Sequence, residues 1–479
     1  MKSLFLLLLP GCAQLFGLDD TTGPTTDAPG PGAHVTIQHE SIGATVVDAP
    51  ADGTTVTFHV PDAAGGFQQV AATLVSRGVW DGDLPDGIHP MVDFQVDGVR
   101  HLWAFPTRDL HVVSALLEHP DPQPAPSPAS LTLNVAVDVA GGESFTLYTV
   151  GAWSAQGLVN PGMAAALTQV VDYEMSTPIG GPLVKIIPAD AVLILRRQLD
   201  IASGTYPLDG VFQTTVAQTG DDTLAGSLNT TAIDKMVTAT VTPNALATRY
   251  TAVRPAVSGL AMGVAVVASP GFTRGNINGP TLNDRGIAMT DTSITLPYGN
   301  PFASLGWNEL VYFNSYESRS VTVTGAMTAF SLDAGEQTFT TPSANLAFDL
   351  PAGLPETISL ESTPLTTDNM TVALDPTKYA HVTMVNDRPS ATFVSAQVLE
   401  VTVDAAGTPA LKLVIEIAAS DPAALVLPPN TLVVGHTYTI AAITHQGGFP
   451  NLATGDLATT APPFHVAHNY SGVFTVESP

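Results

Sequence analysis

Three carboxylates gather in one short, turn-rich stretch of the chain. The segment Trp80-Asp-Gly-Asp-Leu-Pro-Asp-Gly-Ile-His89 carries Asp81, Asp83 and Asp86 beside two glycines and a proline. Carboxylate oxygens are the hard ligands that calcium prefers in proteins. The same residue types also build ordinary solvated turns. The stretch therefore predicts a calcium site at Asp81, Asp83 and Asp86, with a solvated turn as the alternative.

This stretch resembles the calcium loop of the EF-hand family in its spaced aspartates and its glycines. It departs from that loop because Pro85 displaces the third aspartate by one residue, and because the closing glutamate is absent. The resemblance covers this one loop. Calcium is the single cofactor it implies, and we expect no other cofactor.

Tryptophans and histidines cluster near the same loop. Trp80, Trp103 and Trp153 all fall in the first third of the chain, and His101 shares a strand face with Trp103. Exposed tryptophans can stack on the apolar face of sugar rings, whereas buried ones belong to a sandwich core. Trp80 and Trp103 are therefore candidate residues for stacking on a glycan, with core packing as the alternative.

Two further pairs of residues contain histidine. Asp109 and His111 would share one strand face, and His465 and His468 have a three-residue spacing that occurs in metal sites. Neither pair comes with cysteines or with the surrounding polar residues that support a zinc site. The alternative is that these histidines are surface or hydrogen-bonded structural residues.

Sequence motifs of common enzymes are missing. The chain has no Gly-x-Ser-x-Gly, Ser-x-x-Lys or His-Glu-x-x-His motif and no phosphate-binding loop. No catalytic residue is therefore predicted. Because the two carboxylates of a glycosidase can lie far apart in sequence, an exported enzyme that acts on extracellular polysaccharide or protein stays as the alternative.

Period-two alternation of apolar residues recurs along the chain and predicts strands that could position these side chains. The clearest example is Leu131 to Val139, and Met91–Val96 and Val99–Phe105 flank the hairpin turn Asp97-Gly98. The strands expected elsewhere include Val56–Val60, Phe145–Trp153, Leu260–Ala268, Val321–Leu332, Val398–Val403 and Leu411–Ile417. This pattern predicts an all-β protein of two or three β-sandwich modules, of immunoglobulin-like or jelly-roll-like kind, with a few short helices.

One helix and three modules are expected. Asn160 and Pro161 provide a helix start, and Met163, Leu167, Val170 and Val171 follow at helical spacing. We expect a β-sandwich module at 33–157, a β-rich module with this connecting helix at 158–300, and one or more sandwiches at 301–479. The proline-rich segment 119–128 is interpreted as a crossing inside the first module, with a domain linker as the alternative.

The N-terminus predicts export and a lipid anchor. Lys2 precedes an apolar run from Leu4 to Leu9, which is too short to span a bilayer and has the layout of a signal peptide, residues 1–11. The segment Leu9-Pro10-Gly11-Cys12 resembles the lipobox of bacterial lipoproteins, although Pro10 stands where a small non-proline residue is commoner. The resemblance implies cleavage before Cys12 and lipid attachment to Cys12, the only cysteine.

Composition limits the partners. Residues 19–32 hold no large apolar side chain, so 12–32 is predicted to be a disordered, lipid-anchored tether. With 16 Lys and Arg against 43 Asp and Glu, the net charge of −27 argues against nucleic acid. We therefore expect a lipid-anchored cell-envelope protein, at the outer membrane or cell surface, that acts by surface binding of a glycan or protein ligand or as a structural element.

Overall fold

The computed structural model describes residues 32–479 except 43–45, 52–53, 63–65, 97, 117–129, 139–142, 151–153, 163, 173–176, 179–189, 218–220, 254–259, 271, 274–275, 278, 349–351 and 389–390. The predicted signal peptide, Cys12, nearly all of the predicted tether, the proline-rich segment 119–128 and Trp153 lie outside the described residues.

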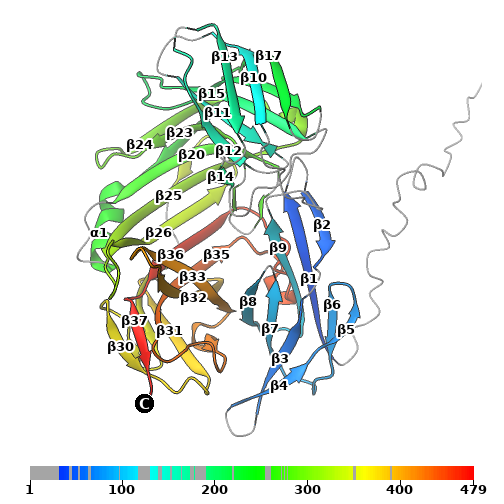
Figure 1. The fold of residues 1–479 in the computed structure, drawn as a ribbon, viewed down its shortest axis with the longest axis vertical. Helices are drawn as coiled ribbons and strands as arrows, with labels where there is room; N and C mark the ends of the chain where they lie inside the picture. Colours follow the sequence, from blue (N-terminus) through cyan, green and yellow to red (C-terminus); the bar gives the residue numbers. More distant parts are fainter. Residues whose placement is uncertain are drawn as a thin grey trace, which may run out of the picture.

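A 14-stranded sheet, which we call the spine, runs through the middle of the molecule (Figure 1). Its main path is β23 (Thr281–Gly286), β20 (Ala261–Ser269), β25 (Asn308–Val321), β26 (Phe330–Thr340), β36 (Phe464–Tyr470), β35 (Thr437–Gly447), β32 (Phe393–Val403), β33 (Pro409–Ala419), β8 (Val99–Ala104), β7 (Met91–Val96), β3 (Val56–Pro61) and β4 (Phe67–Ala71). Strands β37 (Phe474–Glu477) and β30 (Met370–Ala373) extend from β35.

Side chains alternate between the two faces of the spine, because successive residues of a strand point in opposite directions. We call face one the face that carries Val264, Phe313 and Val398, and face two the face that carries Ala265, Tyr312 and Phe393. Each face packs against smaller sheets at different places along the spine. The alternation in β25 and its partners therefore decides which layer each side chain meets.

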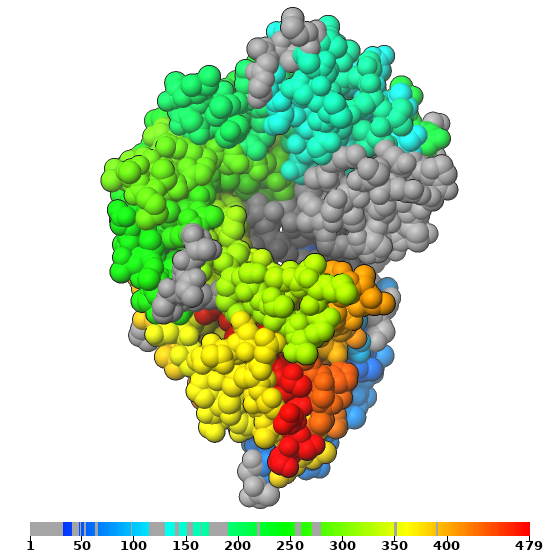
Figure 2. Space-filling view, turned by 60° about the vertical axis from the view of Figure 1, so that its left-hand side comes forward, coloured from blue at the N-terminus to red at the C-terminus, as the bar shows by residue number. Residues whose placement is uncertain are grey.

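Two small sheets cover face one. Near β20 and β25, Val264 and Phe313 share a core with the sheet of β24 (Ser293–Tyr298), β19 (Lys235–Thr240) and β27 (Leu346–Ala347). Near β32 and β35, Val398 shares a second core with the sheet of β29 (Thr363–Pro364), β28 (Pro355–Leu360), β31 (Ala380–Asn386) and β34 (Val426–Leu427). In Figure 2 the C-terminal strand β37, in red, lies between yellow and orange segments of the chain.

A five-stranded N-terminal sheet covers face two from β3 to β36. It contains β2 (Val46–Pro50), β1 (Ala33–Ile42), β6 (Val79–Gly82), β5 (Thr73–Ser76) and β9 (Asp109–Leu116). Val35 and Ile37 of this sheet share a core with Trp103, Phe393 and Phe464 of the spine. The first module is therefore built onto the C-terminal half of the chain, and β8 pairs in parallel with β33.

A separate sandwich lies at one end of the molecule (top of Figure 1). Its first sheet is β13 (Ala166–Asp172), β10 (Ser130–Ala136) and β17 (Asp222–Ser227). Its second sheet is β14 (Thr177–Pro178), β12 (Ser154–Leu158), β11 (Glu143–Thr149), β15 (Ala191–Gln198), β16 (Leu208–Thr215) and β18 (Asn229–Thr230). A two-stranded ribbon, β21 (Phe272–Thr273) and β22 (Asn276–Ile277), completes the sheets.

The prediction of an all-β protein built from sandwich layers is confirmed, and so are most of the expected strands. The hairpin of β7 and β8, the hairpin of β32 and β33 and the buried strand β20 lie where the sequence placed them. The expected strand Val321–Leu332 is wrong in its position, because β25 ends at Val321 and β26 begins at Phe330.

The predicted helix after Asn160 is a strand, β13, in the structure. Leu167 and Val171 are buried while Val170 is 64% exposed, so the segment follows strand alternation despite its helical spacing. β13 pairs with β10, which also pairs with β17, and β11 pairs with β12 and β15. The strands that the sequence placed in one sandwich at 33–157 are therefore divided: β1 to β9 lie in the N-terminal sheet and the spine, whereas β10 and β11 lie in the sandwich at the end of the molecule.

The one α-helix among the described residues is α1 (Pro243–Val253), and three short 3₁₀ turns lie at Ala303–Leu305, Pro422–Ala424 and Leu452–Thr454. None of the helices in the described part of the chain has the length and apolar character needed to cross a membrane.

Replacing Trp103 with alanine tests the core beneath the N-terminal sheet. The ring is 1% exposed and makes edge-to-face contacts with Phe94 and Phe105. We expect Trp103→Ala to lower the free energy of unfolding by about 3–5 kcal/mol in urea denaturation. Leu74→Ala, at a side chain that is 60% exposed, is the control and should change it by less than about 0.5 kcal/mol. Equal effects of the two substitutions would contradict the core assignment.

Candidate functional site

A cavity of about 510 Å³ opens on face two of the spine, over β20, β23, β25 and β26. It lies beside the edge of the N-terminal core, because Tyr312 and Phe339 of its lining also pack against that core. Two rows of directly paired residues cross the four strands here: Asp284, Ala265, Tyr312 and Phe339 in the first row, and Gly286, Gly263, Asn314 and Gln337 in the second. We call this cavity the groove.

An aromatic pair forms one wall of the groove. The rings of Tyr312 and Phe339 stack with centroids 5.1 Å apart and an angle of 26° between their planes. Burial raises the pKa of the Tyr312 phenol, although its hydrogen bond with Asn314 acts in the opposite direction. The phenol therefore stays uncharged at neutral pH and serves as a neutral hydrogen-bonding group.

Small residues leave the floor of the groove low. A Cβ atom at Gly263 would lie 2.8 Å from Oδ1 of Asn314, so glycine is what allows the Asn314 side chain to lie across the neighbouring strand. A Cβ atom at Gly286 would meet nothing nearer than 4.0 Å, which is the carbonyl oxygen of Met262. Together with Ala265 in the neighbouring row, these residues leave space beside Tyr312 that larger side chains would otherwise fill.

The charged residues of the lining are paired. Asp284 forms an ion pair with Arg197, whose guanidinium also donates to the carbonyl oxygen of Tyr206. Arg285 donates to Asp291 at 3.2 Å. The groove therefore presents one tyrosine, two amides and one paired carboxylate on rigid strands, an arrangement suited to holding a neutral polar ligand.

A buried ionic network lies on the opposite face of the same strands. Arg249 of α1 forms an ion pair with Asp387, contacts the carboxyl group of Glu336 of β26, and donates to the carbonyl oxygen of Ala352 at 2.6 Å. Asp387 also accepts a hydrogen bond from the backbone of Leu354. The network fixes α1 and the segment before β28 to the back of the groove strands.

The carboxyl groups of Glu336 and Asp387 face the Arg249 guanidinium, and Arg388 lies close enough to act on Glu336 as well. Burial raises the pKa of Glu336 to about 8, and the nearby charge of Asp387 acts in the same direction, while Arg249 and Arg388 oppose it. Because burial outweighs the attraction of the two guanidinium groups, Glu336 keeps its proton at neutral pH. Burial also raises the pKa of the neighbouring Tyr250, whose hydroxyl lies 2.9 Å from Oγ of Ser315.

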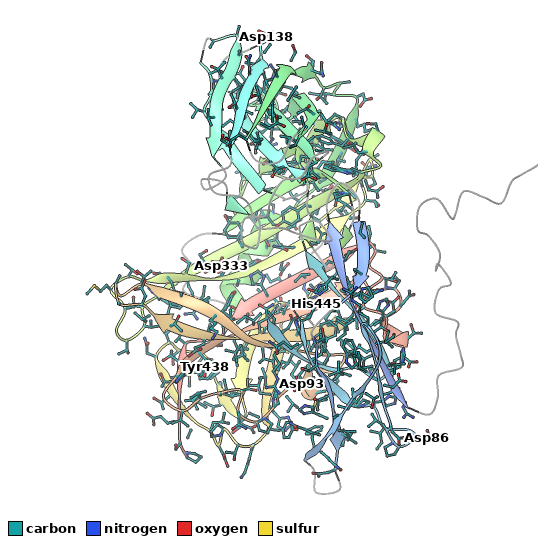
Figure 3. All side chains as sticks on the ribbon, turned by 45° about the vertical axis from the view of Figure 1, so that its right-hand side comes forward. Asp86, Asp93, Asp138, Asp333, Tyr438 and His445 are labelled. Carbon is teal, nitrogen blue, oxygen red and sulfur yellow. The ribbon has the colours of Figure 1, made fainter. Side chains whose placement is uncertain are left out.

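The predicted calcium residues lie far from the groove, at the outer end of the N-terminal sheet (Figure 3, Asp86). Oδ1 of Asp81 is 2.6 Å from Nδ1 of His34, and Asp86 accepts a hydrogen bond from Arg108 at 3.2 Å. No group of three or more metal-binding side chains is placed to hold an ion in the part of the chain that the structure describes. Calcium at Asp81, Asp83 and Asp86 stays a prediction.

The predicted stacking residues are core residues. Trp80 and Trp103 are 5% and 1% exposed, so neither ring offers a face to a ligand in this structure. His101 is buried as well, and its ring stacks on Phe94. The physical reason is the packing of the N-terminal sheet onto face two of the spine, which encloses Trp80 and Trp103 in one core.

Neither Asp109 with His111 nor His465 with His468 forms a shared metal site. His465 and His468 lie on one strand, β36, where a separation of three residues puts them on opposite faces. Nδ1 of His465 is 2.9 Å from Oγ1 of Thr338. His111 is 2.7 Å from the side-chain oxygen of Gln38, as a hydrogen-bonded structural histidine would be.

The sequence analysis did not identify the groove residues, because they form no motif and are marked only by the alternation of exposed and buried side chains along a strand. In β25, Tyr312, Asn314 and Tyr316 share one face while Phe313, Ser315 and Glu317 share the buried one. The polar-aromatic face could have been noted once the strand was assigned. Its partner Gln337 comes from another strand, which the sequence alone does not place.

Comparisons with known proteins are distant. No protein-family model and no curated protein match the chain. Among solved structures it is similar to Escherichia coli alpha-2-macroglobulin activated by porcine elastase, with 9% identity and a TM-score of 0.14, over 94% of this chain and 44% of that one. It is also similar to a tetra-tandem repeat in the extending region of a large adhesion protein, with 11% identity and a TM-score of 0.11, over 91% and 99%. The chain spans less than half of the macroglobulin chain, and the all-β assignment rests on the strand pairing described above.

The buried network predicts a pH dependence that Glu336→Gln should remove. Unfolded, Glu336 has its ordinary pKa near 4.5, whereas in the folded chain it is about 8, so the folded state holds one more proton between these values. Its contribution to stability is full below about pH 4.5 and is lost as the pH rises to 8, at up to about 1.4 kcal/mol per pH unit. Urea unfolding at a series of pH values should show this loss in the original chain but not in Glu336→Gln. The control is the exposed Glu356→Gln, and parallel curves for the chain and Glu336→Gln would contradict the assignment.

Proposed function

We propose that this chain is a lipid-anchored protein of the cell envelope that binds an extracellular ligand through its β-sandwich layers. The observation that supports binding most directly is the groove on face two. Its polar and aromatic side chains project from four paired strands, so their positions are held by the ladder of backbone hydrogen bonds. Binding sites built on rigid elements lose little entropy when a ligand arrives.

The N-terminal sequence supports the anchor. Leu9-Pro10-Gly11-Cys12 resembles a lipobox, and the residues up to 32 have the composition of a flexible spacer. More than one acyl chain on Cys12 would hold the protein stably at a membrane. The net charge of −27 supports a covalent anchor over electrostatic attachment, because anionic lipid headgroups would repel the chain.

Binding fits the groove better than hydrolysis does. Glycoside hydrolysis uses two carboxyl groups on either side of the scissile bond. Asp284 is the one carboxylate among the described lining residues of the groove, and it is paired with Arg197. An exported enzyme acting on polysaccharide or protein remains the alternative, and turnover of any such polymer by the purified chain would favour it.

Radiolabelled palmitate tests the anchor. In a bacterial host, we expect the full-length chain to incorporate label and to sediment with membranes, and Cys12→Ser to do neither, because Cys12 is the only thiol. Pro10→Ala is the matched control, since it keeps the cysteine and restores a commoner lipobox residue; it should label at least as well. Absence of label in all three chains would contradict the anchor.

A further inference from the structure

We propose that the groove binds a neutral polysaccharide chain, with Tyr312 as the stacking residue and Asn314 and Gln337 as the hydrogen-bonding residues. This inference rests on the proposed function as an extracellular binding protein and names its ligand class. A sugar ring combines an apolar face of C–H groups with hydroxyls around its edge, so it needs an aromatic ring and amide groups side by side.

Tyr312 supplies the aromatic ring at a fixed angle. On one side it stacks against Phe339, which prevents the ring from turning away. On the other side its direct neighbour is Ala265 of β20, which is 9% exposed and, with Val267, packs against Tyr312 at the wall of the groove. A pyranose lying over Ala265 would therefore contact the ring without moving any backbone.

Asn314 and Gln337 supply the hydrogen bonds from the next row of the sheet. They are direct partners on β25 and β26, so their Cβ atoms lie about 5 Å apart across the strands, and about 7 Å along the strands from the row of Tyr312. The Asn314 amide leans over Gly263 of β20 and forms a hydrogen bond with Tyr312, whereas Gln337 stands on the other side of β25. Each amide carries two donors and an acceptor, which matches adjacent hydroxyls that both donate and accept. Stacking and hydrogen bonding thus act on the same ring edge.

Beyond the residues that line the groove, β25 carries a second tyrosine, Tyr316. Its side chain is on the same face, four residues beyond Tyr312, and is 45% exposed. The two tyrosines are therefore about 13 Å apart along the strand. That separation exceeds one sugar ring, so the ligand that uses both is a chain rather than a monosaccharide.

The charges near the groove and the net charge of the protein favour an uncharged glycan over a charged one. The two cations nearest the groove, Arg197 and Arg285, are paired with Asp284 and Asp291. The net charge of −27 repels polyanions such as uronic-acid polymers. A neutral glycan meets neither the repulsion nor the cost of breaking these ion pairs.

The floor of the groove favours a glycan over a peptide. Peptides in extended form bind by adding a strand to a free sheet edge, where backbone groups are open. Here β20 pairs with β23 and β25, and β25 pairs with β20 and β26, so the backbone groups of these central strands are already used, whereas β23 is the edge strand of the spine. Over β20 and β25, where Tyr312 and Asn314 lie, recognition must therefore come from side chains.

Affinity electrophoresis of the full-length chain tests the inference, in native gels that contain mixed-linkage β-glucan, xyloglucan, galactomannan or amylopectin. The chain is kept in a detergent without a sugar headgroup, because such headgroups would compete. We expect at least one of these polymers to retard it. Tyr312→Ala should weaken the retardation about tenfold or more, and Gln337→Ala about three- to tenfold.

Three matched variants separate binding from folding. Tyr312→Phe keeps the ring and should bind within about twofold of the original chain. Gly286→Leu should abolish retardation, since a side chain there enters the groove without a backbone clash. Gln68→Ala, at an exposed amide of β4 outside the groove, should change nothing. If thermal denaturation shows that Tyr312→Ala is unfolded, the retardation of Gln337→Ala and Gly286→Leu decides whether the groove is the binding site.

Several outcomes would overturn the inference. These are no retardation by any of the four neutral polymers, equal retardation of the original chain and Gly286→Leu, or retardation only in gels with polygalacturonate or gelatin. Palmitate labelling of the same preparations keeps the two proposals apart. Label without retardation removes the ligand assignment alone, and retardation without label removes the anchor alone.

Discussion

The strict alternation of side chains along one continuous sheet is the constraint on which the rest of this structure depends. The spine has two faces, and successive side chains of β20, β25 and β26 point alternately to one face and to the other. On face one, Phe313 packs into a core and Glu336 joins the buried network with Arg249. On face two, the same strands present Tyr312 and Gln337 to the groove.

Interactions on face one therefore stabilise the strands that carry the groove on face two. A ligand-binding surface of small and polar residues contributes little burial of its own, since Gly263 and Gly286 carry no side chain to pack. Stability for these strands comes from the opposite face, through the apolar core under β19 and β24 and through the bonds from Arg249 to Ala352 and Asp387. The strands under the groove can therefore carry small residues on face two, because packing and hydrogen bonds on face one stabilise them.

Sequence reasoning predicted the all-β class and many strands, because apolar alternation is a local signal. It failed where the same residues satisfied two periods, as in β13, where Leu167 and Val171 fit both a helix and a strand. It left open whether Trp103 stacks on a ligand or packs in a core, because part of that core, Phe393 and Phe464, comes from about 300 residues or more later in the chain, and no local pattern encodes this contact. The groove could not be predicted, because Tyr312, Asn314 and Gln337 come together only through the register of strands that lie between residues 261 and 340.

Hydroxyl-radical footprinting of the full-length chain, with and without each of the four neutral polysaccharides, tests the central claim most directly, because it measures side-chain accessibility residue by residue. The account predicts that one or more polymers protect Tyr312 and Tyr316 from oxidation. The exposed Met327 and Met236, which lie outside the groove lining, should oxidise equally in both conditions. Protection elsewhere with none at these tyrosines, or no protection by any polymer, would contradict the claim that face two of the spine is the ligand-binding surface.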